Sequence, residues 1–134
     1  MNESGYTRSI STKVKSSLAW KILDPYQSGV PDTFYEGQQR DLWIEYKYLA
    51  KIPKRLTTLV DLTDHKKFLS KKQQAWLKRR HQTRQDAWVI LGSPLGGLVF
   101  KDLEWMHPFP TSFLLENVKD AHYVAKTISD YINK

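Results

Sequence analysis

The chain has 134 residues, the length of one ordinary domain, and contains no apolar run long enough to cross a bilayer. Hydrophobic residues make up 40% and charged residues 26%, which is typical of a globular protein, so we expect one domain over residues 1–134. The absence of cysteine excludes disulfides and thiolate zinc sites, and the polar start MNESGYTRSISTK lacks the apolar stretch of a secretion signal. We therefore expect a cytoplasmic location, or the host-cell cytoplasm if a virus encodes the chain, and no membrane partner.

The charge is strongly basic, with a net value of +7 and a pI of about 9.6. Between residues 65 and 84 there is no acid, and the bases are Lys66, Lys67, Lys71, Lys72, Lys78, Arg79, Arg80 and Arg84. Residues 85–134 are mildly acidic instead. This distribution predicts one positive face and a polyanionic partner such as nucleic acid.

The first predicted elements are a helix and a hairpin. Ile10, Val14 and Leu18 recur at a spacing of four, which predicts a helix over residues 8–21 that ends near Asp24-Pro25. Two β-rich runs follow, at 32–37 and 41–50, joined by a polar loop over 37–40. The pattern predicts an antiparallel pair of strands.

The later elements alternate between helix and strand. Residues 50–64 read as a loop with a short strand, residues 70–84 as a helix, and residues 87–92 and 96–102 as two strands around a Ser93-Pro94 turn. After an irregular aromatic segment over 103–113, a last helix is expected over 115–132, with Leu115, Val118, Ala121, Ala125, Ile128 and Ile132 on one side. The order α-β-β-α-β-β-α predicts an α/β domain in which helices flank a central mixed sheet.

The second strand carries the residues that could support chemistry. Strand alternation places Trp43, Glu45 and Lys47 on one side, and the apolar side, with Leu42, Ile44, Tyr46 and Tyr48, toward the core. Asp32 begins the neighbouring strand, so two carboxylates and an ammonium can converge. Mg²⁺ binds one or two protein carboxylates and leaves other positions to water and phosphate, while a nearby lysine can orient an attacking water.

These residues resemble a known family. Pro31-Asp32 followed by Glu45-Tyr46-Lys47 looks like the signature of PD-(D/E)XK nucleases. The surrounding runs YQSGVPD, LWIEYK, LSKKQQAWLKRR and AWVILG resemble the VRR-NUC and Holliday-junction-resolvase branches, over about residues 8–93. The resemblance implies a restriction-endonuclease-like core, with residues 94–134 as a C-terminal strand and helix extension.

The resemblance also implies roles for individual residues. Asp32 and Glu45 would bind Mg²⁺, with Mn²⁺ able to substitute, and the backbone carbonyl of Tyr46 would add a ligand. Lys47 would position the nucleophilic water. Gln73 would match a glutamine of the family's next helix, and helical spacing puts it, unlike Gln74, on the stripe that faces the sheet.

One departure from the family concerns the first helix, where many members carry an acid. The predicted helix has none between Arg8 and Ile22. Glu3 lies upstream and could serve as a metal ligand only if the N-terminal segment folds back. The number of metal ions therefore stays open.

Each of these signals also has a structural explanation. Glu45 and Lys47 could decorate the solvated face of an edge strand. Ser70-x-x-Gln73 fits a capping box, and the basic run could be a solvated helix face. Trp76 and Trp88 fall at core positions, and the four histidines lack metal-ligand spacing.

The combined prediction is a Mg²⁺-dependent DNA endonuclease with Asp32, Glu45, Lys47 and Gln73 as catalytic residues. A chain this small favours structure-selective cleavage of branched, flapped or nicked DNA, and cutting both strands of a junction favours a homodimer. The alternatives are a sequence-specific restriction-like or homing-type nuclease, and a non-catalytic basic module that binds nucleic acid. The residues expected to contact DNA are Lys13, Lys15, Lys71, Lys72, Lys78, Arg79 and Arg80.

Overall fold

The computed structural model describes residues 1–22 and 29–134. The described residues form a five-stranded sheet in the order β1-β2-β3-β5-β6. Its strands are β1 (Leu18–Lys21), β2 (Thr33–Glu36), β3 (Asp41–Tyr48), β5 (Ala87–Ser93) and β6 (Gly96–Phe100). β3 and β5 run parallel, whereas the other neighbouring pairs are antiparallel, so the predicted mixed sheet is confirmed.

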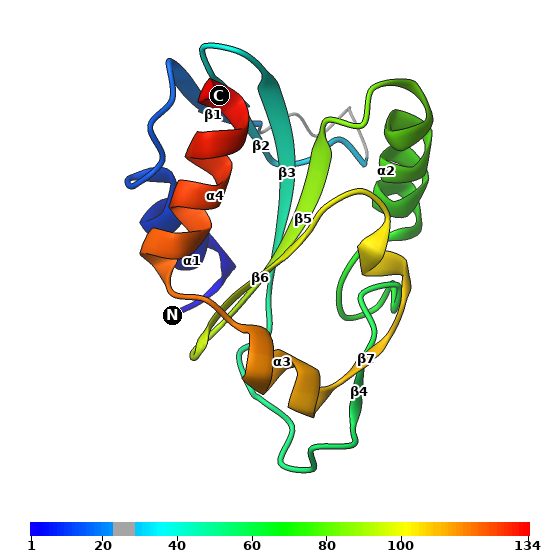
Figure 1. The fold of residues 1–134 in the computed structure, drawn as a ribbon. Coiled ribbons are helices and arrows are strands. Elements are labelled where there is room, and N and C mark those ends of the chain that lie inside the picture. The colour runs from blue at the N-terminus through cyan, green and yellow to red at the C-terminus, as the bar shows by residue number, and fades with distance from the viewer. Residues whose placement is uncertain (23–28) are drawn as a thin grey trace.

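Helices flank both faces of this sheet (Figure 1). One face carries α1 (Glu3–Ser11) and α4 (Ala121–Asn133). The other is covered by α2 (Lys71–Thr83), the 3-10 helix η1 (Glu104–Met106), α3 (Thr111–Asn117) and a small sheet of β4 (Leu59–Val60) and β7 (Phe109–Pro110). Across the described residues, the helices are too short or too polar to cross a membrane.

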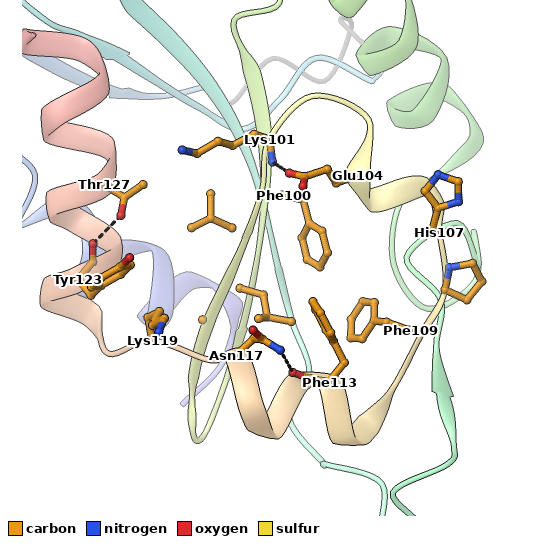
Figure 2. A pocket seen from close by; sticks show the side chains of 14 residues that line it. Phe100, Lys101, Glu104, His107, Phe109, Phe113, Asn117, Lys119, Tyr123 and Thr127 are labelled. Carbon is orange, nitrogen blue, oxygen red and sulfur yellow. Dashed lines mark hydrogen bonds between the residues drawn. The ribbon is translucent and has the colours of Figure 1, made fainter.

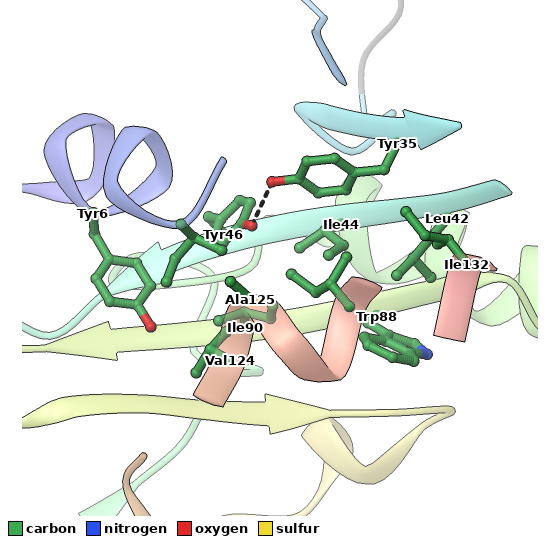
Figure 3. Packing of buried hydrophobic residues seen from close by; sticks show 12 residues of the cluster. Tyr6, Tyr35, Leu42, Ile44, Tyr46, Trp88, Ile90, Val124, Ala125 and Ile132 are labelled. Carbon is green, nitrogen blue, oxygen red and sulfur yellow. Dashed lines mark hydrogen bonds between the residues drawn. The ribbon is translucent and has the colours of Figure 1, made fainter. Parts of the chain in front are cut away.

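Strand β3 is covered on both of its faces. Its side chains Leu42, Ile44 and Tyr46 pack under α1 and α4 in the first core, where Tyr35 and Tyr46 share a 2.7 Å hydroxyl hydrogen bond (Figure 3). On the opposite face, the ring of Trp43 lies 5.7 Å from that of Trp76 on α2. Because β3 lies at the centre of the sheet, the alternative of a solvated edge strand for Glu45 is wrong.

The predicted helix over 8–21 is wrong in its bounds. Asn2 caps α1 through a 2.9 Å bond from the amide of Gly5, and the helix ends at Ser11. Leu18–Lys21 instead pair with β2, and Leu18 stays 48% exposed, so its spacing from Ile10 did not mark a buried stripe. In β1, pairing with the open edge of β2 supplies hydrogen bonds for the backbone N–H and C=O groups. In the predicted helix, the same groups would have been paired within the helix itself. The predicted end near Asp24-Pro25 lies outside the described residues.

The predicted single helix over 115–132 is also wrong, because two helices occupy this region. α3 ends at Asn117, Val118 is extended, and Lys119 pairs with Gly97 of β6. Asp120 then caps α4 by accepting a 2.8 Å bond from the amide of Tyr123. A strong N-cap inside the apolar pattern restarts the helix in a new direction.

The segment predicted to be irregular over 103–113 instead contains η1, β7 and the start of α3, whereas the other predicted elements are confirmed with shifts of a few residues at their ends. The β2–β3 hairpin closes over the 37–40 loop, β4 is the short strand expected within 50–64, and α2 begins after Ser70. β5 and β6 form an antiparallel hairpin over Pro94-Leu95. The C-terminal α4 contributes Val124, Ala125, Ile128 and Ile132 to the first core, so residues 94–134 complete the same fold.

Candidate active site

Asp32 and Glu45 lie beside each other where the β2–β3 ladder ends. The last paired residues are Thr33 and Ile44, so Asp32 and Glu45 occupy the next positions on the two strands. Strand alternation turns both side chains, and that of Lys47, toward the α2 side of the sheet. Lys47 Nζ lies 3.6 Å from Glu45 Oε2, so the structure brings the three predicted residues together.

The neighbouring Thr33 holds the carboxylate of Asp32. Thr33 Oγ1 donates to Asp32 Oδ1 at 3.0 Å, and the backbone N–H of Tyr46 lies close enough to lower the pKa of the same carboxyl group. Since the N–H and C=O of one strand residue point to the same side, the carbonyl of Tyr46 also faces Asp32. Sequence reasoning missed the role of Thr33, because a threonine at a strand start carries no distinctive pattern.

Glu3 lies close enough for its charge to act on both Asp32 and Glu45. It is the first residue of α1. The first helix does carry an acid, because it begins at residue 3 rather than residue 8. Glu3 lies in this helix without any folding back of the N-terminus, and its role as a metal ligand stays a prediction, since the described side chains form no group of three acidic, histidine or cysteine ligands.

The surroundings raise the pKa values of both carboxyl groups. Burial, opposed by the Thr33 hydrogen bond and reinforced by the charge of Glu3, raises the pKa of Asp32 to about 6. Burial and the nearby Asp32 raise the pKa of Glu45 to about 8, against the opposing effect of Lys47. Two acids that share a dry site repel each other when both are ionised. A cation between them would relieve this repulsion.

One carboxylate oxygen of Glu45 lacks a hydrogen-bond partner. Glu45 is 2% exposed, and its Oε1 atom is buried without a hydrogen-bond partner among the described residues. Buried polar atoms are normally satisfied, so an unsatisfied carboxylate oxygen fits a site that binds a cation. The described side chains do not gather three acidic, histidine or cysteine ligands at one point. Mg²⁺ needs one or two carboxylates, and Asp32, Glu45 and the Tyr46 carbonyl match that donor set.

Gln73 forms the capping box that the sequence left as an alternative. The side-chain Oε1 of Gln73 accepts from the backbone N–H of Ser70 at 2.9 Å, and the backbone N–H of Gln73 donates to Ser70 Oγ at 3.1 Å. Gln74 is half-buried rather than outside the packed stripe, and its side chain donates to the carbonyls of Thr63 and Leu69. The capping role of Gln73 is therefore present, and a role in catalysis stays a prediction.

The first turn of α2 lies against the segment that leads into Asp32. Gly29 has φ +87°, and a side chain there would come within 2.5 Å of the carbonyl oxygen of Lys72. Glycine is therefore required both by the backbone conformation and by the close approach. This contact places the start of the basic helix next to the Pro31-Asp32 motif.

The predicted DNA-contacting residues divide between two layers. Lys71, Lys72, Lys78 and Arg79 are exposed on α2. Lys13 and Lys15 follow α1 on the opposite helical layer and line a cavity with α4. The structure therefore places Lys13 and Lys15 apart from the basic residues of α2, and the DNA contacts of both groups stay predictions.

Arg80 has an acidic partner that the charge count missed. Its Nε and second amino nitrogen donate to the two oxygens of Asp86 at 2.7 and 2.9 Å. Asp86 lies just beyond the acid-free segment and is brought back by the turn between α2 and β5. A bidentate pair of this kind is strong, so Arg80 is structurally engaged, and its predicted contact with DNA stays a prediction.

Comparisons of the chain with models of protein families, with curated proteins and with solved structures find no match. The chemistry of the site therefore stands on its own geometry. A buried and a half-buried acid, a backbone carbonyl and a lysine on one rigid sheet can hold a hard divalent cation and present an ammonium beside it.

Proposed function

We propose that the protein is a Mg²⁺-dependent DNA endonuclease with a restriction-endonuclease-like core of the PD-(D/E)XK type. The observation that carries the proposal is the pair of half-buried Asp32 and buried Glu45, whose raised pKa values, together with the unsatisfied Oε1 of Glu45, suit a cation. The adjacent Lys47 and the basic surface of α2 add the features expected of phosphodiester hydrolysis.

Each residue has a defined part in this proposal. Asp32, Glu45 and the Tyr46 carbonyl would hold the cation, which supplies Lewis-acid chemistry and a more acidic bound water. Thr33 keeps the Asp32 carboxylate in place. Lys47, whose side chain is 15% exposed, can orient the attacking water and stabilise charge on the phosphoryl oxygens. Glu3 is the candidate for an additional acidic ligand.

We propose structure-selective cleavage because a domain of this size has little surface for reading a long sequence. Branched, flapped or nicked DNA is the substrate class that follows, and a homodimer would supply two active sites for a junction. Mn²⁺ is expected to replace Mg²⁺. A sequence-specific nuclease and a non-catalytic binding module are the competing functions.

The test is cleavage of supercoiled plasmid, linear duplex, flapped duplex and a four-way junction, with Mg²⁺, with Mn²⁺ and with chelator. Metal-dependent cleavage should disappear in Asp32→Asn, Glu45→Gln and Lys47→Ala while DNA binding remains. Asp41→Asn is the matched control, since Asp41 is an exposed acid on the same strand β3. Its cleavage rate should equal that of the wild type.

The competing functions give different patterns in the same assay. Discrete fragments from long linear duplex would indicate sequence-specific cleavage. Binding to every substrate without cleavage in either metal would overturn the nuclease proposal and support the binding module.

A further inference from the structure

A cavity lies against β6, the edge strand at the opposite edge of the sheet from β1. Its volume is about 420 Å³, and β6, η1, α3 and α4 all contribute to its wall. Phe100, Phe109 and Phe113 form an aromatic side, and Tyr123 lies across from them on α4 (Figure 2). Phe113 and Tyr123 are 42% and 54% exposed, so their surfaces are accessible at the mouth. The size falls in the usual range for small-ligand pockets.

The outer edge of β6 is closed at both ends of this cavity. Gly97 exchanges two backbone hydrogen bonds with Lys119, of 2.8 and 3.0 Å. Four residues further along the chain, the backbone N–H of Lys101 donates to Glu104 Oε1 at 2.8 Å. Gly97 and Lys101 therefore direct their backbone groups away from β5.

Val99 lies midway between the two closures. Because backbone groups of an antiparallel strand alternate in direction, the N–H and C=O of Val99 face outward as those of Gly97 do. Val99 lines the cavity, and within the described ranges these two groups have no hydrogen-bond partner there. One donor and one acceptor are thus presented side by side in a pocket that has an aromatic side and several polar residues.

This arrangement discriminates between two kinds of ligand. An added peptide strand needs several consecutive open residues, and here the Lys119 and Glu104 closures leave one. A nucleobase needs a single adjacent donor and acceptor, which every base presents on its Watson–Crick edge, together with an aromatic surface for its faces. Lys101 and Lys119 also border the cavity, and their positive charges suit the phosphates that accompany a base.

We propose that this cavity binds one unpaired base of a DNA strand, with the edge of the base on the Val99 backbone and its phosphates near Lys101 and Lys119. The inference rests on the proposed function in one respect, which is that DNA is the partner. It does not depend on the cleavage reaction. Because Watson–Crick pairing uses the same edge, a base in a duplex cannot occupy the pocket. The pocket therefore selects unpaired nucleotides without selecting their sequence.

The test measures binding of a fluorescent single-stranded oligonucleotide by anisotropy, in chelator so that cleavage cannot occur. The comparison is an oligonucleotide of equal length and charge that has abasic sugars in place of nucleotides. The wild type should bind the base-bearing strand about fivefold or more tightly, as base stacking on aromatic side chains requires. Phe113→Ala and Tyr123→Ala should each reduce this ratio toward one.

Val99→Pro tests the backbone contact, because proline removes the outward N–H and is tolerated on an edge strand. Val99→Ala keeps the N–H and is the matched control. The ratio should fall in the proline variant alone, with folding checked by circular dichroism. If Val99→Pro does not fold, the two aromatic variants decide.

An equal affinity for base-bearing and abasic strands in the wild type, or a ratio unchanged in the Phe113 and Tyr123 variants, would overturn the inference. The outcome is separable from that of the proposed function. A protein that fails to cleave can still show the ratio, and an active nuclease can lack it.

Discussion

At the scale of single residues, Glu45 is the least usual feature of the molecule. An acid at the centre of a sheet costs free energy unless its charge is compensated, and Lys47 at 3.6 Å compensates one oxygen in part. The other oxygen is left without a partner among the described residues. A buried acid whose charge is only partly compensated is typical of sites where a bound ligand supplies the missing partner.

The pKa values predict how the stability of the metal-free protein depends on pH. Asp32 and Glu45 bind protons more tightly in the folded than in the unfolded chain, because their folded pKa values are raised. Their contribution to the free energy of unfolding is complete below about pH 4. It is lost as the pH rises through about 6 for Asp32 and about 8 for Glu45. Between these limits the free energy of unfolding should fall by up to about 1.4 kcal/mol per pH unit for each titrating group.

Urea denaturation in chelator at several pH values measures this slope. Glu45→Gln should flatten the slope at its upper end, whereas Asp41→Asn, at an exposed position, should leave it unchanged. Mg²⁺ should restore stability at high pH in the wild type and not in Glu45→Gln. A wild-type stability that rises from pH 5 to pH 8 in chelator would contradict the prediction.

At the scale of elements, α2 combines a structural and a functional role. Its first turn is fixed by the Ser70 and Gln73 capping box and lies against Gly29, while its exposed side carries Lys71, Lys72, Lys78 and Arg79. Its last turn is tied to the start of β5 by Arg80 and Asp86. The helix is therefore anchored at both ends beside the candidate site.

The capping box predicts that Ser70→Ala and Gln73→Ala each lower the free energy of unfolding by about 1 kcal/mol. Urea denaturation measures this change, and cleavage rates separate the two possible roles of Gln73. If Gln73 acts in catalysis, Gln73→Ala should slow cleavage far more than Ser70→Ala does. Equal rates in the two variants would leave Gln73 with its capping role.

The exposed bases of α2 predict a change in salt dependence. Replacing Lys71, Lys72, Lys78 and Arg79 with glutamine should weaken DNA binding and lower the slope of log K against log salt by about 0.9 for each duplex phosphate that the helix no longer neutralises. Lys13→Gln with Lys15→Gln, on the opposite layer, is the control and should change the slope less. An unchanged slope in the α2 variant would remove this helix from the DNA interface.

At the scale of the whole molecule, the N- and C-terminal helices share one face of the sheet (Figure 1). The segment after α1 is joined to α4 by a 3.0 Å bond from the amide of Lys15 to Ser129 Oγ and a 2.7 Å bond from the Asn133 side chain to the carbonyl of Lys15. This packing holds α1, and with it Glu3, against the sheet that carries Asp32 and Glu45.

The first core predicts that Ile128→Ala is strongly destabilising. Ile128 is fully buried between α4 and the sheet, so truncation should lower the free energy of unfolding by about 2–5 kcal/mol. Leu115→Ala is the control, because Leu115 is 40% exposed on α3 although the sequence pattern placed both residues on one helix face. Denaturation curves that show equal destabilisation of the two variants would contradict this description of the core.

Much of the fold was predictable where a local pattern and the tertiary structure agree. The alternation in DLWIEYKY identified β3 and the side that carries Glu45 and Lys47, and the Ser70-x-x-Gln73 spacing identified the start of α2. The errors lie where a local pattern competed with non-local pairing. Leu18–Lys21 joined the edge of β2, and Lys119 paired with Gly97, which broke the last helix.

The sequence by itself determined which residues could form a site, because the period of a strand places Glu45 and Lys47 together and a turn places Asp32 beside them. Tertiary structure alone decided the burial of Glu45, the approach of Glu3, the engagement of Arg80 by Asp86 and the exposed backbone of Val99. These features depend on which segments cover each face and each edge of the sheet. Such contacts join residues distant in the chain, and local periodicity carries no information about them.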